Sequence, residues 1–235
     1  MAKPLVELRS VVDEHEVVRH PFLQDFSKGQ LTKDQVVKWF EQQFHFSTSL
    51  PKCFAALYAR IEGSQWKTTG KLADLIQTEA WGSSAHDAHS IYFKEVAKYL
   101  GIDLETLSSE APREFSSTYI RKRLAVCLDS RFDVTTGLAA IALGNEYLNL
   151  HIFRAYREGI HKIVGLEDCP TGYFDAHLRD EEDDFSIFQD LYEANSSHEN
   201  RSQAKEKLIE LLDSRVSFFD DLLAYLNIDN TNTKN

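Results

Sequence analysis

Residues 31–46 read LTKDQVVKWFEQQFHF, a stretch with the features of a helix that begins abruptly and continues for several turns. Thr32 is a favourable N-cap, and Gln35 three residues later completes the pattern of a capping box. The apolar residues that recur at four-residue intervals are Val36, Phe40 and Phe44. Because residues four apart share one face of a helix, we expect a long helix here whose apolar face packs into the core.

Residues that interrupt helices are scarce along the whole chain. The 235 residues include 10 Gly and 5 Pro, about half of the average share, and neither type occurs after Gly172. No stretch alternates with the two-residue period of a half-buried strand. We therefore expect an all-α protein with one domain over residues 1–226 and a polar C-terminal tail over 227–235. Seven main helices are predicted, at about residues 4–18, 32–62, 68–100, 114–130, 133–162, 171–194 and 201–226.

The chain is acidic. Its formal net charge of -11 and its pI near 5.3 argue against the surfaces rich in Lys and Arg that bind nucleic acids or anionic membranes. No apolar run is long enough to cross a membrane, and the first residues lack the apolar segment of a signal peptide. The 3 cysteines form no CxxC pair, so neither a disulfide framework nor a zinc ribbon is indicated. We expect a cytoplasmic protein that binds neither nucleic acid nor membranes.

Two segments carry metal-ligand residue types at intervals that place them on one helix face. Glu79 and His86 are seven residues apart, and His177, Glu181 and Asp184 follow one another at i, i+4 and i+7. A third candidate ligand, Glu146, is a carboxylate that follows nine uncharged residues. The four carboxylates among these residues could neutralise two divalent cations, and their mixture with imidazoles favours iron or manganese over structural zinc.

Each of these residues also has an ordinary structural interpretation. Acidic runs such as 180–184 are commonly solvated helix faces. Glu146 could pair with Arg154, and Glu79 with His86 could form a buried polar pair. The spacing therefore leaves a metal site and plain structural roles as alternatives.

Several motifs near the N-terminus resemble a known family. The motifs are His20-Pro21-Phe22, Gly29 with Leu31-Thr32 and Gln35, and Gln43-Phe44-His45-Phe46 before Pro51. They are similar to the first two helices of the haem-oxygenase-like fold that thiaminase-like, pyrroloquinoline-quinone-synthase-like and chlamydial death-domain-associating proteins share. The resemblance extends over most of the chain and implies a seven-helix bundle of this type.

The resemblance also implies a set of metal ligands. Di-iron oxidases and oxygenases of this fold carry Glu-x6-His on one helix, a carboxylate on a later one, and His-x3-(Asp/Glu)-x2-His on a third. The matching residues here are Glu79 and His86, then Glu146, then His177 and Glu181. Where the last histidine of the family pattern is expected, this chain has Asp184, and Asp180 is an alternative ligand one position before Glu181.

The activity that the resemblance implies is a non-haem di-iron oxidase or oxygenase with two Fe(II) ions and O2 as co-substrate. The ligand order is similar to that of nitrile-forming members. It implies a small amino-acid-like substrate and, most specifically, conversion of a brominated tryptophan side chain to a nitrile with carbon–carbon cleavage. An external reductant and a homodimer are also expected. The alternatives are a metal-free, thiaminase-like hydrolase and a non-catalytic protein-binding member of the fold.

Overall fold

The computed structural model describes residues 4–61, 66–81, 89–196 and 201–227, and all regular structure within them is helical. The N-terminal part consists of α1 (Pro4–Glu7), α2 (Arg9–Glu14), the 3-10 turn η1 (Glu16–Arg19) and α3 (Pro21–Ser27). The helices of the middle part are α4 (Lys33–Tyr58), α5 (Trp66–Glu79), α6 (His89–Leu100), α7 (Leu104–Ser109) and α8 (Glu114–Leu128). The remaining segments are α9 (Val134–Ile141), the π-helical segment η3 (Ala142–Tyr147), α10 (Leu148–Gly159), the 3-10 turn η4 (Ile160–Lys162), α11 (Gly172–Asn195) and α12 (Arg201–Asn227). This arrangement confirms the all-α prediction.

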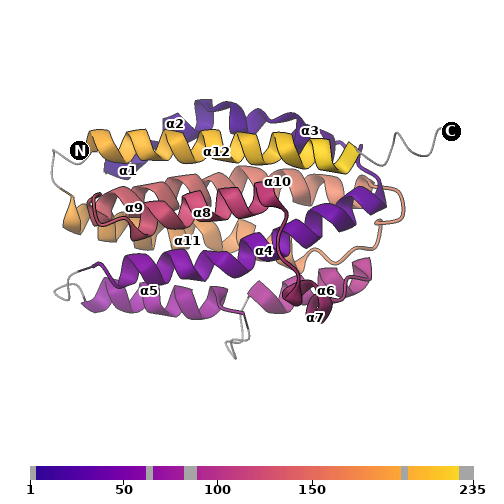
Figure 1. The fold of residues 1–235 in the computed structure, drawn as a ribbon, viewed down its shortest axis with the longest axis horizontal. Helices are drawn as coiled ribbons and strands as arrows, with labels where there is room; N and C mark the ends of the chain where they lie inside the picture. Colours follow the sequence, from indigo (N-terminus) through magenta and orange to yellow (C-terminus); the bar gives the residue numbers. More distant parts are fainter. Residues whose placement is uncertain (1–3, 62–65, 82–88, 197–200, 228–235) are drawn as a thin grey trace.

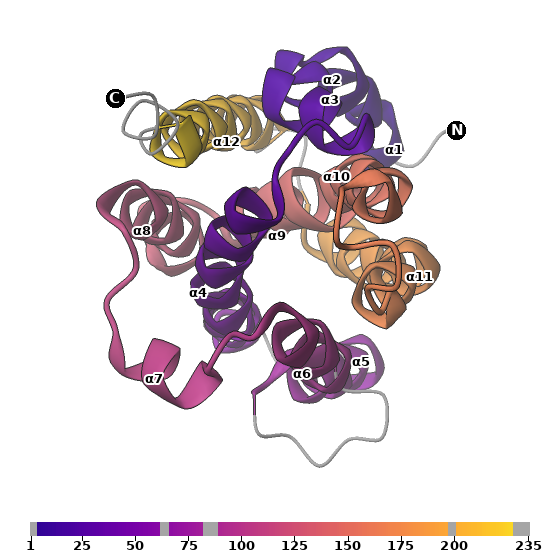
Figure 2. The same cartoon turned by 90° about the vertical axis from the view of Figure 1, so that its right-hand side faces the viewer.

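The long helices run side by side along the long axis of the molecule (Figure 1). The view along that axis places α4 between α8 and the α5–α6 layer, with α11 on the opposite side of that layer from α7 (Figure 2). Helix α11 contacts α9, η3 and α10 on one side and α5 and α6 on the other. Helix α11 therefore contacts both the α5–α6 layer and η3 and joins these two parts of the bundle.

The capping box predicted at the start of α4 is present. Thr32 Oγ1 accepts a hydrogen bond from the Gln35 backbone N–H at 3.2 Å, and Gln35 Oε1 accepts one from the Thr32 backbone N–H at 2.9 Å. The predicted apolar face is buried, with Val36, Phe40 and Phe44 all in the core. Because the cap fixes where the helix begins, it also fixes which residues of α4 face inward.

The predicted single helix over 68–100 is wrong. Helix α5 ends at Glu79 and α6 begins at His89, with Ala80 and Trp81 outside both. The geometric argument that Glu79 and His86 share one helix face therefore does not hold for α5. Glycine and serine are poor helix formers, so the Gly82-Ser83-Ser84 sequence was an available signal for a helix end near Glu79.

Two other predicted helices differ in detail. Residues 4–18 form α1, α2 and η1 instead of one helix, and the His15 ring, whose Nδ1 accepts from the Val17 backbone N–H at 3.3 Å, caps the third piece. The 133–162 stretch is continuous but changes to π-helical winding over Ala142–Tyr147. The described residues consequently contain more helical segments than the seven predicted. None of the described helices is long and apolar enough to cross a membrane.

Candidate metal centre

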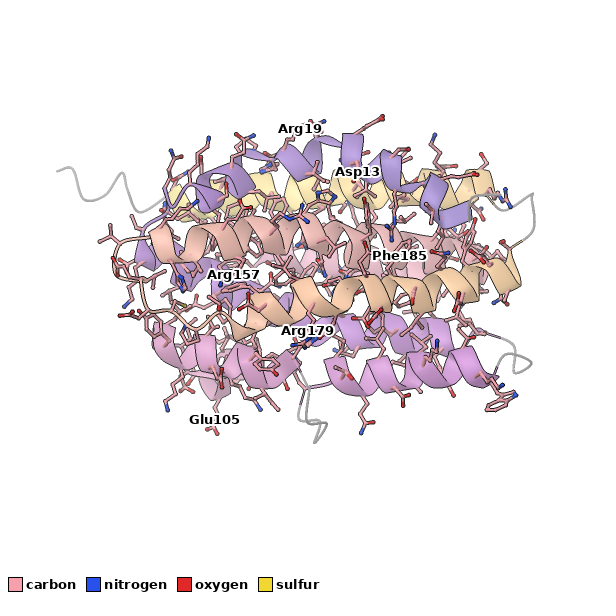
Figure 3. All side chains as sticks on the ribbon, turned by 180° about the vertical axis from the view of Figure 1, so that it is seen from behind. Asp13, Arg19, Glu105, Arg157, Arg179 and Phe185 are labelled. Carbon is pink, nitrogen blue, oxygen red and sulfur yellow. The ribbon has the colours of Figure 1, made fainter. Side chains whose placement is uncertain are left out.

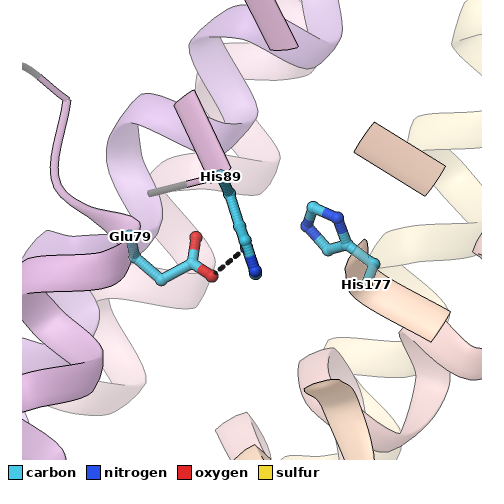
Figure 4. A group of neighbouring side chains, drawn as sticks. All are labelled: Glu79, His89 and His177. Carbon is cyan, nitrogen blue, oxygen red and sulfur yellow. Dashed lines mark ion pairs between the residues drawn. The ribbon is translucent and has the colours of Figure 1, made fainter. Parts of the chain in front are cut away.

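Two adjoining groups of ligand-type side chains lie in the interior of the bundle. The first group is Glu79, His89 and His177, and the second is Glu146, Glu181 and Asp184. Within each group the candidate ligand atoms all lie within 4.8 Å of one another. Glu79 is the last residue of α5 and His89 the first of α6, so two helix ends meet near His177, which lies in the first third of α11 (Figure 4).

The first group contains a buried ion pair. His89 Nδ1 lies 2.6 Å from Glu79 Oε1, and His89 Nε2 lies 3.5 Å from an Asp180 carboxylate oxygen. Burial opposes a charge on His89, but Glu79 and Asp180 outweigh it and raise the pKa of His89 to about 10. Burial also favours the neutral form of Glu79, yet His89 holds the pKa of Glu79 below its ordinary value. His89 is thus an imidazolium between two carboxylates and must lose a proton before it can bind a metal.

His177 is already in the form that a metal requires. Its Nδ1 lies 2.8 Å from the Tyr173 backbone carbonyl oxygen, which can only accept, so the ring proton is on Nδ1 and Nε2 keeps its lone pair. Burial and the neighbouring His89 lower the pKa of His177 to about 3. The ring is stacked on Phe153 with 3.9 Å between centroids, which restricts its orientation.

The second group brings three carboxyl groups together, with little nearby positive charge to offset their negative charges. Burial raises the pKa of Glu146 to about 7 and that of Asp184 to about 8, and it raises the pKa of Glu181 well above its ordinary value. Mutual repulsion adds to this effect, since Glu79 and Glu146 both raise the pKa of Asp184. Glu181 Oε2 is buried and has no hydrogen-bond partner in the part of the chain that the structure describes.

Amide side chains hold two of these carboxylates in place. Asn145 Nδ2 donates to Glu146 Oε1 at 3.0 Å, and Asn149 Nδ2 donates to Glu181 Oε1 at 3.0 Å. The fully buried Arg123 donates to Asn145 Oδ1 at 3.0 Å, which fixes the orientation of that amide. Sequence reasoning did not identify these three supporting residues, because a hydrogen-bond chain between separate helices has no sequence period.

The carboxylate of Glu146 is positioned by unusual backbone winding. The segment Ala142–Tyr147 is a π-helix inside an otherwise continuous helical run. One extra residue per turn rotates the side chains that follow relative to an α-helix, and such segments often occur at functional sites. Here the segment directs Asn145 and Glu146, both buried, toward the interior.

The structure places the sequence-predicted residues as follows. It brings Glu146, Glu181 and Asp184 together in one group, and Glu79 and His177 together in the other. His86 lies outside the described residues. Asp180 contacts His89 and is not in the second group.

The structure also shows contacts and exposure that bear on two of the structural alternatives. Glu146 accepts from Asn145, whereas Arg154 is exposed. In the acidic run, Glu181 is buried while Glu182 and Asp183 are exposed, so only part of this run is a solvated face. His89 was missed because it lies ten residues after Glu79, an interval that no single helix face would produce.

The donor set fits divalent metal ions. Three clustered carboxyls, one of them with an unpartnered buried oxygen, are costly to ionise without a cation. A neutral imidazole with a free Nε2 lies in the adjoining group. Carboxylates mixed with imidazole suit iron or manganese better than a structural zinc site, which favours thiolates.

A helical bundle with buried carboxylates and histidines defines this chain as an all-helical protein with a candidate metal centre. Comparison with known proteins then gives the family: the TENA/THI-4/PQQC family model matches residues 9–225, and the chain belongs to that family.

Curated relatives of the chain are two proteins called 4-aminobenzoate synthase. The one from Chlamydia muridarum is 24% identical over 137 residues, which cover 58% of this chain and 55% of that protein. The one from Chlamydia trachomatis is 25% identical over 208 residues, which cover 88% of this chain and 80% of that protein. The first alignment therefore spans only about half of its relative.

Solved structures establish the fold. A TenA homologue from P. horikoshii OT3 matches with a TM-score of 0.74 at 15% identity and covers 94% of this chain and 98% of its own. A domain from Shewanella denitrificans OS217 with a heme oxygenase-like fold matches with a TM-score of 0.73 at 14% identity, with coverages of 96% and 91%. The single-domain, haem-oxygenase-like fold predicted from the sequence is thereby confirmed.

Proposed function

We propose that this chain is an O2-dependent oxidase or oxygenase whose centre holds two Fe(II) ions. The observation that carries the proposal is the pair of adjoining buried groups, Glu79/His89/His177 and Glu146/Glu181/Asp184. The relatives called 4-aminobenzoate synthase support an enzymatic role within the family. Iron bound at these residues would supply the activation of O2 for the oxidation of an organic substrate.

The protein's own residues have separate tasks in such an enzyme. His177 would offer Nε2, while its Nδ1–H stays bonded to the Tyr173 carbonyl. Glu146 and Glu181 would offer carboxylate oxygens that Asn145 and Asn149 keep oriented. Burial of these groups excludes water, which strengthens their attraction for a cation.

The substrate that we propose is a small amino-acid-like molecule. The particular reaction is conversion of a brominated tryptophan side chain to a nitrile with carbon–carbon cleavage, and an external reductant would restore the ferrous state. Its support is the ligand order Glu79, His86, Glu146, His177, Glu181 and Asp184.

A homodimer is also proposed, and sedimentation velocity tests it.

An anaerobic Fe(II) titration followed by exposure to O2 tests the proposed function. We expect about two Fe(II) per chain, and O2 consumption that speeds up with one member of a panel of aromatic amino acids. Glu181→Gln should lose iron binding, whereas Glu182→Gln, the exposed neighbour on the same helix, should not. Equal iron binding by the two variants would contradict the assignment.

Neither alternative explains the two buried groups. A thiaminase-like hydrolase would need a reactive cysteine, but Cys53, Cys127 and Cys169 are buried and belong to neither group. Burial raises the pKa of Cys169 to about 11, which disfavours its thiolate. A hydrogen bond with Cys127 and the nearby Arg123 lower the pKa of Cys53 to about 7, so Cys53 is the cysteine that the hydrolase alternative would require. Turnover that persists in the presence of chelator would favour the hydrolase, and specific protein capture without metal or turnover would favour the binding protein.

A further inference from the structure

A cleft connects the candidate metal centre with the protein surface between α5 and α11. Its volume is about 480 Å³, and three of its lining residues, His89, Asp180 and Asp184, are those discussed at the centre. Arg179, which also lines the cleft, lies on the side of α11 that faces the α5–α6 layer (Figure 3). A cleft of this size accommodates a small organic molecule.

The outer part of the cleft carries charges of both signs. Lys71 and Asp74 line it from α5, and Asp183 lines it from α11. Within the described part of the chain, none of these three side chains takes part in an ion pair or a side-chain hydrogen bond. Arg179, by contrast, donates two hydrogen bonds of 2.6 Å to Asp180.

The spacing of these charges has a chemical consequence. Lys71 and Asp74 are three residues apart on α5, which separates their backbone positions by about 4.5 Å along the helix axis. A helical pair at this interval could neutralise itself, yet here the ammonium and the carboxylate do not meet. Apart from the Arg179–Asp180 pair and the residues of the metal centre, the cleft therefore offers the Lys71 cation and the Asp74 and Asp183 anions to a ligand that carries the opposite charges close together.

We propose that this cleft binds the zwitterionic head group of a free α-amino acid. The Lys71 ammonium pairs with the ligand carboxylate, and Asp74 together with Asp183 pairs with the ligand ammonium. The head group then occupies the outer part of the cleft that His89 and Asp184 also line. This inference rests on the proposed function and adds to it the residues that select the substrate class.

Isothermal titration calorimetry under anaerobic conditions tests the inference, with both iron-free and Fe(II)-loaded protein. Tryptophan, bromotryptophan, phenylalanine, tyrosine and leucine form the first panel. For the tightest binder, the methyl ester removes the ligand carboxylate charge and the N-acetyl derivative removes the ammonium charge. We expect each derivative to bind about tenfold more weakly than the amino acid, because each leaves a charged group of the cleft without its partner.

The variant Lys71→Met tests whether the amino acid binds in this cleft or at another site. We expect it to weaken binding of the amino acid about tenfold and to leave binding of the methyl ester unchanged. Lys67→Met is the matched control, because Lys67 is on the same helix, lies over the Trp66 ring at 5.4 Å and does not line the cleft. Equal amino-acid binding by the two variants, equal binding of acid and ester, or no binder in the panel would each overturn the inference.

Iron loading and O2 consumption are measured on the same protein samples. If iron binds and O2 is consumed while no amino acid binds, this inference fails alone. If an amino acid binds with the predicted charge dependence while iron does not, the proposed function fails and the cleft assignment stands.

Discussion

Three carboxyl side chains within 4.8 Å of one another set the chemistry of this protein at the scale of single residues. In the metal-free chain they keep protons up to about neutral pH, since burial and mutual repulsion raise the pKa values of Glu146 to about 7 and of Asp184 to about 8. A divalent cation would replace those protons. The same side chains can therefore be neutral acids or ligands, depending on the metal.

His89 is the residue where sequence and structure differ most. His89 lies with Glu79 and His177 in the first group, so His89→Ala is expected to weaken Fe(II) or Mn(II) binding about tenfold to hundredfold, because the site loses an imidazole donor. Binding of Mn(II) followed by electron paramagnetic resonance measures this. His151→Ala, at a partly exposed position paired with Asp13, is the control.

His86→Ala belongs in the same experiment because the sequence predicts His86 as a ligand. If His86→Ala weakens binding while His89→Ala behaves like His151→Ala, the placement of His89 in the metal group is wrong. His89 would then serve only as the counter-charge of Glu79.

Asn145 is predicted to act on the metal through Glu146. Asn145→Asp keeps an acceptor for Arg123 but cannot donate to Glu146, so we expect metal affinity to fall about tenfold or more while the fold is retained. Calorimetric titration of Mn(II) gives the affinity, and circular dichroism checks the fold. Asn195→Asp, at the far end of α11, should bind metal like the unmodified protein, and the same result for Asn145→Asp would refute the prediction.

At the scale of elements, helix ends and a change of winding assemble the site. Glu79 ends α5, His89 begins α6, and Glu146 lies in the π-helical segment, while His177, Glu181 and Asp184 come from one ordinary helix. The i, i+4, i+7 spacing on α11 was readable from the sequence, because one helix face has a fixed period. The π-helical winding was not readable, because it leaves no compositional pattern.

The approach of α3 to α10 supplies a prediction about stability. A Cβ atom on Gly159 would lie 1.8 Å from the Phe26 carbonyl oxygen, so Gly159→Ala requires backbone movement and should destabilise the protein by about 3 kcal/mol. Gly70→Ala in α5 meets no atom within 4 Å and should stabilise by about 0.5–1 kcal/mol. Urea unfolding measures both, and similar midpoints for the two variants would contradict the close packing.

At the scale of the whole molecule, the buried acids link stability to pH. The pKa values of Glu146 and Asp184 rise to about 7 and 8 from ordinary values of 4.5 and 3.8. The folded metal-free protein then holds protons that the unfolded chain has released. Their contribution to stability is complete below the unfolded pKa values, falls progressively as pH rises above them, and is fully lost at about pH 7 and pH 8.

We therefore expect the melting temperature of chelator-treated protein to fall between about pH 5 and pH 8. His89, whose pKa rises to about 10, should continue this fall at higher pH. Bound Mn(II) should reduce this fall, because the metal replaces the protons. Asp184→Asn should also reduce it. Differential scanning calorimetry in matched buffers measures the effect, and a melting temperature that rises over this range without metal would show that the acids are not protonated.

The sequence by itself determined the helical class, the start of α4 and the face of α11 that carries His177, Glu181 and Asp184. Each of these depends on local rules, namely scarce helix breakers, a capping box within four residues, and a fixed period along one helix. These features needed no knowledge of neighbouring elements.

Only the tertiary structure decided which groups share a site. It paired Glu79 with His89, placed Glu146 against Glu181 and Asp184, and connected Arg123 to this group through Asn145. Such contacts join residues that are far apart in the chain, and their distances depend on how whole helices pack. The burial that shifts the pKa values of these groups likewise arises only when the helices enclose them.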